Sequence, residues 1–336
     1  MVDWQRRQGR QHLPWQHTRD PYRVWLSEIM LQQTQVSTVL DYYPRFLARF
    51  PDVAGLAAAD QDEVLGLWSG LGYYSRARHL HRCAQVVVSA HAGQFPRSAA
   101  ALAQLPGIGR STAAAIAAFC FDERVAILDG NVKRVLSRVL GYGADLAQLA
   151  HERMLWDLAT QLLPAQANDM PAYTQSLMDL GATVCLPRRA LCHDCPVAGM
   201  CVAQAQGTPL AYPVRTRKLK RSSVTLWLLW AVDPQGQVWL HKRPARGIWA
   251  GLYSLPVFES EAALLAVCPP VPPLQRHHLQ AWKHVLTHCD LFLHPVRLTL
   301  ATGQAPAGDG QWVPQEDWPA LGLPAPVRSL LEGERG

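Results

Sequence analysis

The sequence predicts an all-α region followed by a smaller α+β domain, and three observations support this. Up to about Cys201, apolar residues recur three, four or seven positions apart, which is the spacing of one helix face. Beyond Cys201, short β-branched and aromatic runs bounded by Gly or Pro predict strands. Four cysteines crowd together where the two patterns meet. At 336 residues, the chain is long enough for two or three domains with buried cores.

The helical elements can be placed in order along the first part of the chain. In residues 21–50, Trp25, Ile29, Val36 and Tyr43 fall on one apolar face. Similar patterns follow in residues 61–68, 76–91, 98–104, 111–121, 130–140, 151–163 and 171–184. Proline and glycine interrupt them at Pro51, Gly70 to Gly72, Pro96, Pro106, Gly141 and Pro164. Helices joined by such short connections predict a compact all-α region.

The C-terminal part begins with a linker. Residues 203–223 are polar, basic and aperiodic, which is typical of a linker. Strands are expected in residues 222–232, 236–244 and 288–300. The formal net charge is +6, and five cations fall in residues 215–221 alone. Because the positive charge is concentrated in this short segment, it is weak evidence for a polyanionic partner. Whether the chain binds such a partner has to be inferred from sequence motifs.

Four of the eight cysteines lie within seventeen residues, at Cys185, Cys192, Cys195 and Cys201. We expect a cytosolic protein, since the sequence shows no apolar run of the length that a signal peptide or a membrane span needs. In that compartment a cysteine cluster predicts a metal site rather than disulfides. Four thiolates can hold either zinc or an iron–sulfur cluster, and the spacing does not choose between them.

A glycine turn divides two helix-prone runs in "LPGIGRSTAAAI", residues 105–116. Gly107 and Gly109 let the backbone approach a ligand closely, and the start of the second helix favours an anion. A nucleotide-binding P-loop would end in Gly-Lys-Ser/Thr, which is absent here. A helix-hairpin-helix turn that grips a DNA phosphate needs only these features. The alternative is an ordinary corner between helices with Ser111 near the cap.

Two carboxylates are candidates for acid–base chemistry. Asp129, in "VAILDGNVKRVL", is most simply the N-cap of the following helix, a role that still allows its carboxylate to face a cleft. Glu28 shares a polar stripe with Gln32 and Gln35 inside an apolar helix. A solvated stripe is the simpler interpretation, but the apolar flanks would raise the pKa of Glu28 if it is buried. A protonated carboxylic acid beside an ionised one can cleave a glycosidic bond.

Five ordered motifs carry a family resemblance that extends from about Trp15 nearly to the C-terminus. They are "VWLSEIMLQQTQV", "LWSGLGYYSRARHLH", "LPGIGRSTAAAI", "ILDGNVKRVL" and the four-cysteine pattern. In this order they resemble the helix-hairpin-helix DNA glycosylases with an iron–sulfur cluster, and among them the MutY family of adenine DNA glycosylases. The resemblance implies a six-helix domain at residues 18–129 and an iron–sulfur domain at residues 1–17 and 130–204. A basic linker at 205–221 and a MutT/Nudix-like α+β domain at 222–336 would follow.

The resemblance also implies a substrate and a chemistry. The substrate would be double-stranded DNA carrying adenine opposite 8-oxoguanine or guanine, with the adenine flipped out of the helix. Glu28 would be the acid that protonates the leaving adenine, Asp129 would stabilise the oxocarbenium-like sugar, and Asn131 would support the site. A [4Fe-4S] cluster would be held by Cys185, Cys192, Cys195 and Cys201.

Further residues match DNA-contacting segments of the family. Gln33 and the segment Leu71 to Tyr73 would wedge into the duplex beside the oxidised base; without the family, Tyr73 and Tyr74 would be expected to pack between helices. The implied DNA-binding set is Gln32, Gln33, Leu71, Tyr73, Gly107, Gly109, Ser111, Thr287 and His288.

The C-terminal domain resembles the MutT-like domain of the same glycosylases, as in "GIWAGLYSLPVFES". No glutamate-rich magnesium box follows this segment, so we expect recognition without hydrolysis. The family's Phe-Ser-His loop reads 8-oxoguanine, and the matching residues here are Leu286, Thr287 and His288. The hydroxyl and the imidazole are kept, whereas the aromatic ring is lost.

Three rival functions are weaker. A bifunctional relative like endonuclease III, which cleaves the strand after removing oxidised pyrimidines, needs a lysine where this chain has Ser111. Lys133 lies four residues after Asp129, away from that position. A non-catalytic iron–sulfur DNA-binding protein would not need the Glu28 and Asp129 pair, and a nucleotide-pool hydrolase would need the missing magnesium box. Nothing in the sequence demands more than a monomer or suggests a membrane partner.

Overall fold

A computed structural model describes residues 1–216, 220–270 and 272–333; residues 217–219 of the expected linker lie outside this range. The chain packs into two units. The first unit contains residues 1–58 and continues from His79 through the helical region, and the second contains residues 59–78 and the C-terminal region.

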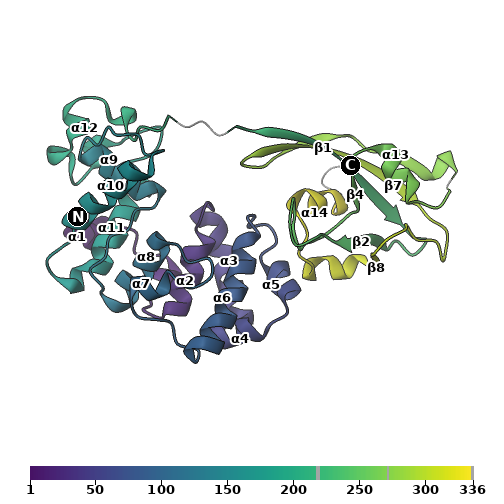
Figure 1. Cartoon of the computed structure of the whole chain (residues 1–336), viewed down its shortest axis with the longest axis horizontal. Coiled ribbons are helices and arrows are strands. Elements are labelled where there is room, and N and C mark those ends of the chain that lie inside the picture. The colour runs from purple at the N-terminus through teal and green to yellow at the C-terminus, as the bar shows by residue number, and fades with distance from the viewer. Residues whose placement is uncertain (217–219, 271, 334–336) are drawn as a thin grey trace. The chain divides into compact units, whose positions relative to one another are not determined.

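The first unit is helical, as the apolar spacing predicts, and Figure 1 shows its helices in purple to teal. Its helices are α1 (Val2–Gln8), α2 (Pro21–Met30), α3 (Val36–Arg49), α4 (Val53–Ala58), most of α6 (Ser75–His91), α7 (Ala99–Leu102), α8 (Arg110–Phe121), α9 (Gly130–Val139), α10 (Leu149–Gln161), α11 (Met170–Thr183) and α12 (Val202–Ala205). The expected helices from residue 76 to residue 184 are confirmed with ends that shift by one or two residues.

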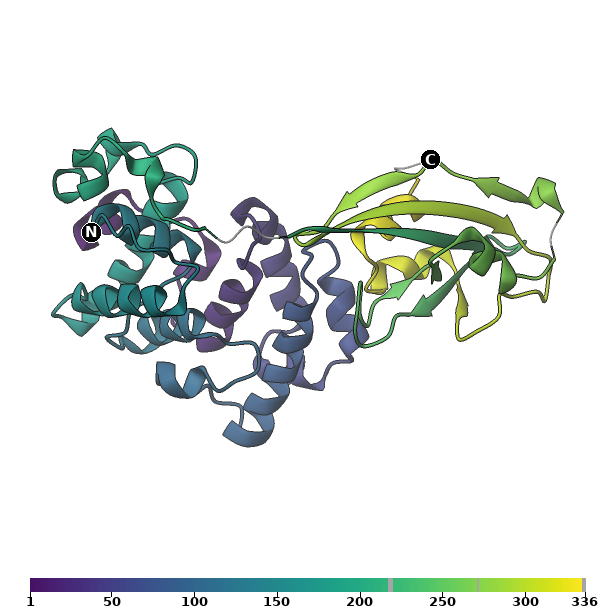
Figure 2. The same cartoon turned by 45° about the horizontal axis from the view of Figure 1, so that its top comes forward.

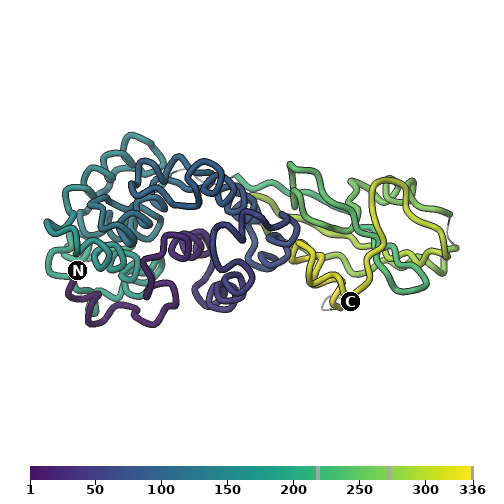
Figure 3. The backbone as a smooth tube through the Cα atoms, turned by 90° about the horizontal axis from the view of Figure 1, so that it is seen from below, coloured from purple at the N-terminus to yellow at the C-terminus, as the bar shows by residue number. Residues whose placement is uncertain are grey.

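The expected single helix over residues 21–50 is wrong, because the structure has two helices there. The chain turns after Met30, Gln33 adopts a left-handed backbone with φ of 56°, and α3 starts after Gln35. Each helix buries apolar residues of its own. The apolar spacing therefore continues across the turn and does not reveal it. α1 was not expected, and it packs against α11, as the purple N-terminal end of the tube in Figure 3 shows.

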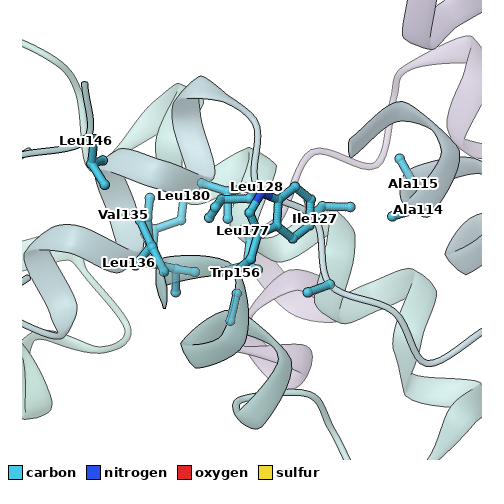
Figure 4. Close-up of a cluster of buried hydrophobic side chains, with 14 of the residues drawn as sticks. Ala114, Ala115, Ile127, Leu128, Val135, Leu136, Leu146, Trp156, Leu177 and Leu180 are labelled. Atoms are coloured by element: carbon cyan, nitrogen blue, oxygen red, sulfur yellow. The ribbon is translucent and has the colours of Figure 1, made fainter. Parts of the chain in front are cut away.

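The core of the first unit that matters most for the site lies between α8, α9, α10 and α11. The alanines of α8 are fully buried, so neighbouring backbones can approach it closely. Figure 4 shows the ring of Trp156, from α10, among Ile127, Leu128 and Leu177. This packing holds the start of α9, and therefore Asp129, against α8 and α11.

The second unit is built on a mixed sheet. Its strands are β1 (Ser222–Val232), β2 (Val238–Lys242), β3 (Tyr253–Ser254), β4 (Val257–Phe258), β5 (Arg276–His278), β6 (Trp282–Val285), β7 (Cys289–Thr299) and β8 (Gln311–Val313). The long strands β1 and β7 are parallel and pair from Ser222 with Cys289 to Val232 with Thr299, side by side in Figure 2. The three expected strands are confirmed, and β6 leads through a short turn into β7.

Helices and the segment 59–78 complete this unit. α13 (Glu261–Ala266) and α14 (Ala325–Leu331) pack with the sheet, and α5 (Gln61–Leu67) packs on the 3-10 turn Gln315–Ala320. Lys242 pairs with Asp62, which ties β2 to α5. None of the described helices is long and apolar enough to cross a membrane. The fold class that the sequence predicts, helical first and α+β after it, is confirmed.

Candidate active site

A cleft of about 820 Å³ opens in the first unit. Five of the predicted catalytic and DNA-binding residues line it, namely Glu28, Gln32, Ser111, Asp129 and Asn131. They come from the end of α2, the start of α8 and the start of α9, segments far apart along the chain. Gln33, Gly107 and Gly109 do not line it.

Glu28 sits on the last turns of α2, among residues that are almost all buried. Burial, and secondarily the nearby charge of Asp129, raise the pKa of Glu28 to about 8. The first cause is desolvation, because burial beside the apolar side chains of α2 disfavours the ionised carboxylate. The shift favours the protonated form of Glu28 at neutral pH, whereas a fully solvated stripe would leave its pKa near the ordinary value.

Asp129 is the N-cap of α9, as the sequence predicts, and its carboxylate accepts the Val132 N–H at 2.8 Å. Burial raises the pKa of Asp129, but several neighbours oppose the shift. The backbone N–H groups of Val132 and Asn131 and the cations Arg134 and Lys133 all favour its ionised form. The two carboxyl groups thus occupy different environments, which suits one for the acid role and the other for the anion role.

Arg134 holds the start of α9 in place, a role that the sequence motifs did not reveal. Its guanidinium is buried and donates to Asn131 Oδ1 at 2.9 Å, to the carbonyl of Gly181 at 2.7 Å and to the carbonyl of Cys185 at 2.8 Å. A Cβ on Gly181 would lie 2.7 Å from Asn131 Cβ, so only glycine allows α11 to pass this close. In the sequence, the only indication of this role is the position of Arg134, one turn into the helix that Asp129 caps.

The glycine turn joins α7 to α8. Gly107 has φ of 76°, and a Cβ there would collide with His79 Cβ at 2.5 Å. Gly109 is the N-cap of α8, and open space surrounds its missing Cβ. Ser111 does not cap the helix; its hydroxyl accepts the N–H of Leu128 at 3.1 Å. Ser111 lies two residues after the N-cap Gly109, which agrees with the corner interpretation, and its hydroxyl also braces the segment that leads to Asp129.

Two further groups in the first unit bear on chemistry. Lys133 Nζ donates to Glu152 Oε1 at 2.7 Å and does not line the cleft. Gln16, which sequence reasoning missed, does line it, and within the described part of the chain its buried Nε2 has no hydrogen-bond partner. A buried donor without a partner is costly unless a ligand takes it.

The four clustered cysteines line one small cavity with Arg138. Burial raises the pKa of Cys195, and the other three sulfurs raise it further, so the four thiols lie close together. Arg138 Nη1 donates to Cys185 Sγ at 3.2 Å, and the same guanidinium binds the carbonyl of Leu186. Among the described residues no three His, Cys, Asp or Glu side chains are arranged to hold a single metal ion. The four sulfurs and the buried cation suit a larger, negatively charged group.

Thr287 and His288 lie in the turn between β6 and β7 of the second unit. The Thr287 hydroxyl hydrogen-bonds the Tyr73 hydroxyl at 2.8 Å. Tyr73 is 43% exposed and has φ of 48°, so it is not the packing aromatic that composition alone suggested. Tyr74 instead donates to the carbonyl of Leu323. Left-handed backbone is costly at a bulky residue such as Tyr73.

The raised pKa of Glu28 has a consequence for stability. Between its ordinary value of 4.5 and about 8, the unfolded chain releases the proton while the folded chain keeps it. The stability contributed by the protonated form is therefore complete below pH 4.5 and is lost as the pH rises to about 8. A Glu28→Gln variant has no such loss. We expect it to be more stable than the parent by about 4 kcal/mol at pH 8 and nearly equal to it at pH 4.5.

Urea unfolding followed by helical circular dichroism at the two pH values measures this difference. Asp157→Asn, which neutralises an exposed carboxylate on α10, is the control and should change little at either pH. A Glu28→Gln advantage that does not grow with pH would contradict the buried, protonated state.

Comparison with known proteins agrees with both units. Residues 26–160 match the family described as HhH-GPD superfamily base excision DNA repair protein, and residues 227–333 match the NUDIX domain family. A solved structure of a thermostable thymine-DNA glycosylase covers 61% of this chain and 93% of its own, with a TM-score of 0.53 and 29% identity.

Curated relatives match over nearly the whole chain. The adenine DNA glycosylase of Buchnera aphidicola subsp. Schizaphis graminum is 32% identical over 99% of this chain and 96% of its own length. The adenine DNA glycosylase of Mus musculus is 36% identical over 93% of this chain and 72% of its own. The chain therefore belongs to the adenine DNA glycosylases of the HhH-GPD superfamily.

Proposed function

We propose that this protein hydrolyses the N-glycosidic bond of adenine in DNA where adenine is paired with 8-oxoguanine or guanine. One observation carries the proposal: Glu28, whose pKa is raised to about 8, lines the same cleft as Asp129. A buried base needs to be flipped out of the duplex to reach such a cleft. The Nε2 group of Gln16, which has no partner among the described residues, would then be available to donate to the base.

Each carboxyl group has one role in the reaction. Glu28 donates its proton to a ring nitrogen of adenine, so the electron pair of the breaking C–N bond leaves on a neutral base. The sugar becomes an oxocarbenium-like cation, which the Asp129 carboxylate stabilises. Water then adds to the anomeric carbon, and the Glu28 carboxylate takes the released proton. Asn131, fixed by Arg134, keeps the start of α9 in place.

Strand cleavage is not part of the proposal. A lyase needs an amine that can attack the sugar, and Ser111 supplies a hydroxyl already bonded to Leu128. Lys133 is the nearest amine in sequence to Asp129, and it is paired with Glu152 outside the cleft. The bifunctional alternative therefore lacks a placed nucleophile.

The glycine turn would bind one DNA phosphate at the start of α8. Its N–H groups and dipole favour an anion, and the open space at Gly109 leaves room for it. Such a contact fixes the position of the DNA without reading its sequence. Gln32, Gln33, Leu71 and Tyr73 would contact or wedge the duplex, while Thr287 and His288 would read the base opposite adenine.

A [4Fe-4S] cluster on Cys185, Cys192, Cys195 and Cys201 fits the thiol cavity. Such a cluster, when bound, would crosslink the cysteine loop, and this chain's own Arg138 would offset part of its negative charge. We further propose a monomer that works in the cytoplasm on chromosomal DNA, with no membrane partner.

The activity is tested with a duplex that carries adenine opposite 8-oxoguanine. We expect strand breakage only after hot alkali, because the product is an abasic site. Glu28→Gln and Asp129→Asn should each lower the single-turnover rate by about a thousandfold or more. Breakage without alkali would favour a lyase, and no abasic site at all would refute the glycosylase.

The phosphate contact is tested with Gly109→Ala. The new methyl group meets open space in the free protein, so we expect stability to change by less than about 1 kcal/mol. It would nevertheless stand where a phosphate approaches, and DNA affinity should fall about tenfold, measured by fluorescence anisotropy at fixed salt. Gly55→Ala, in α4, whose new Cβ would make only ordinary contacts with Asp52 and Pro51, is the matched control. Equal affinities for the two variants would count against the phosphate site.

The cofactor is tested by chemical analysis of purified protein. We expect about four iron and four sulfide per chain, lost in Cys195→Ala and kept in Cys268→Ala, a cysteine outside the cavity. A colourless protein that contains zinc instead would overturn the assignment.

A further inference from the structure

The turn that would read the base opposite adenine is held by backbone hydrogen bonds at both ends. The N–H of Leu286 donates to the carbonyl of Cys289 at 2.8 Å, and the N–H of Ser222, in β1, donates to the carbonyl of His288 at 3.1 Å. The two carbonyls between them, those of Leu286 and Thr287, accept from a donor outside the turn.

Arg221 supplies that donor. It immediately precedes β1, and its guanidinium donates to the Thr287 carbonyl at 2.8 Å and to the Leu286 carbonyl at 2.9 Å. The same group forms an ion pair with the Asp290 carboxylate. Lys283 Nζ binds the other oxygen of Asp290 at 2.5 Å. Arg221 thus contacts the turn at two consecutive residues and the strand that follows it.

The guanidinium shape matters for this arrangement. Three acceptors lie around one planar fork, which arginine matches and lysine, with a single ammonium centre, does not. With its carbonyls held, the turn directs the Thr287 side chain to a fixed position, where its hydroxyl meets that of Tyr73. Loss of Arg221 would leave two carbonyls without their donor and free the turn to rotate.

We propose that Arg221 is a positioning residue for selectivity, which sets the 286–288 turn so that the protein distinguishes 8-oxoguanine from guanine opposite adenine. This inference rests on the proposed glycosylase function. Arg221 need not touch the base; it acts through the two carbonyls that it holds. Arg221, at the C-terminal end of the basic linker, would then position the turn against the oxidised base in addition to attracting DNA through its charge.

The experiment uses the full chain with Arg221→Lys, which keeps the charge, and Arg221→Ala, which removes it. Lys220→Ala removes the neighbouring exposed cation and is the matched control. Single-turnover rates and kcat/KM are measured on duplexes with adenine opposite 8-oxoguanine and opposite guanine. Dissociation constants for the same two duplexes are measured by anisotropy in a Glu28→Gln background, so that selectivity is also seen without chemistry.

We expect both Arg221 variants to lower the preference for 8-oxoguanine over guanine about tenfold, with the rate on the guanine duplex changed less than about twofold. Lys220→Ala should weaken both duplexes equally and reduce the salt dependence of binding. The inference is overturned if Arg221→Lys keeps the parental preference, if both duplexes weaken equally, or if the parent shows no preference. Failure of the proposed function has a different signature, namely no abasic site in either duplex.

Discussion

The buried fork of Arg134 is the interaction on which the site depends. It joins three segments that are distant in sequence: Asn131 at the start of α9, Gly181 in α11 and Cys185 at the start of the cysteine loop. Asp129 caps the same helix, so its position is set by the same contacts. Its Nε and Nη2 groups make these three hydrogen bonds, which fix the orientation of the buried guanidinium, and removing a partner would leave a buried charge less well compensated. The cysteine loop and the cleft are therefore mechanically connected through one side chain.

The second organising feature is the difference between two carboxyl groups in one cleft. Glu28 has only desolvation and a neighbouring anion acting on it, and both favour the protonated form. Asp129 is also buried, but it has N–H donors and cations that favour the anion. The helix start supplies those donors at no extra cost, because a capping carboxylate binds them in any N-capped helix. An ordinary capping interaction thus becomes part of an acid–anion pair.

Sequence reasoning could find what is local. The spacing of apolar residues placed most helices, and the N-cap role of Asp129 followed from the residues around it. Contacts between distant segments could not be predicted. No residue close to Arg134 in sequence indicates Gly181 as its partner, and none close to Gln16 indicates that this side chain lines the cleft. The turn at Gln33 was missed because left-handed backbone at a glutamine is costly and leaves no compositional trace. The resemblance to the family added the roles of Glu28 and Tyr73, which composition alone had assigned to solvent and to packing.

The loss of the aromatic ring at Leu286 changes where selectivity has to come from. A ring would add stacking or insertion energy to any base, whereas a hydroxyl distinguishes bases by the donors and acceptors they present. In the proposed function, Thr287 and His288 would carry the polar contacts, and a hydroxyl discriminates only if it is held at a defined distance and angle. The bonds from Arg221 to the turn, together with the Tyr73 hydroxyl, would supply that constraint. The proposed selectivity would then depend on the rigidity of a short turn more than on the size of its side chains.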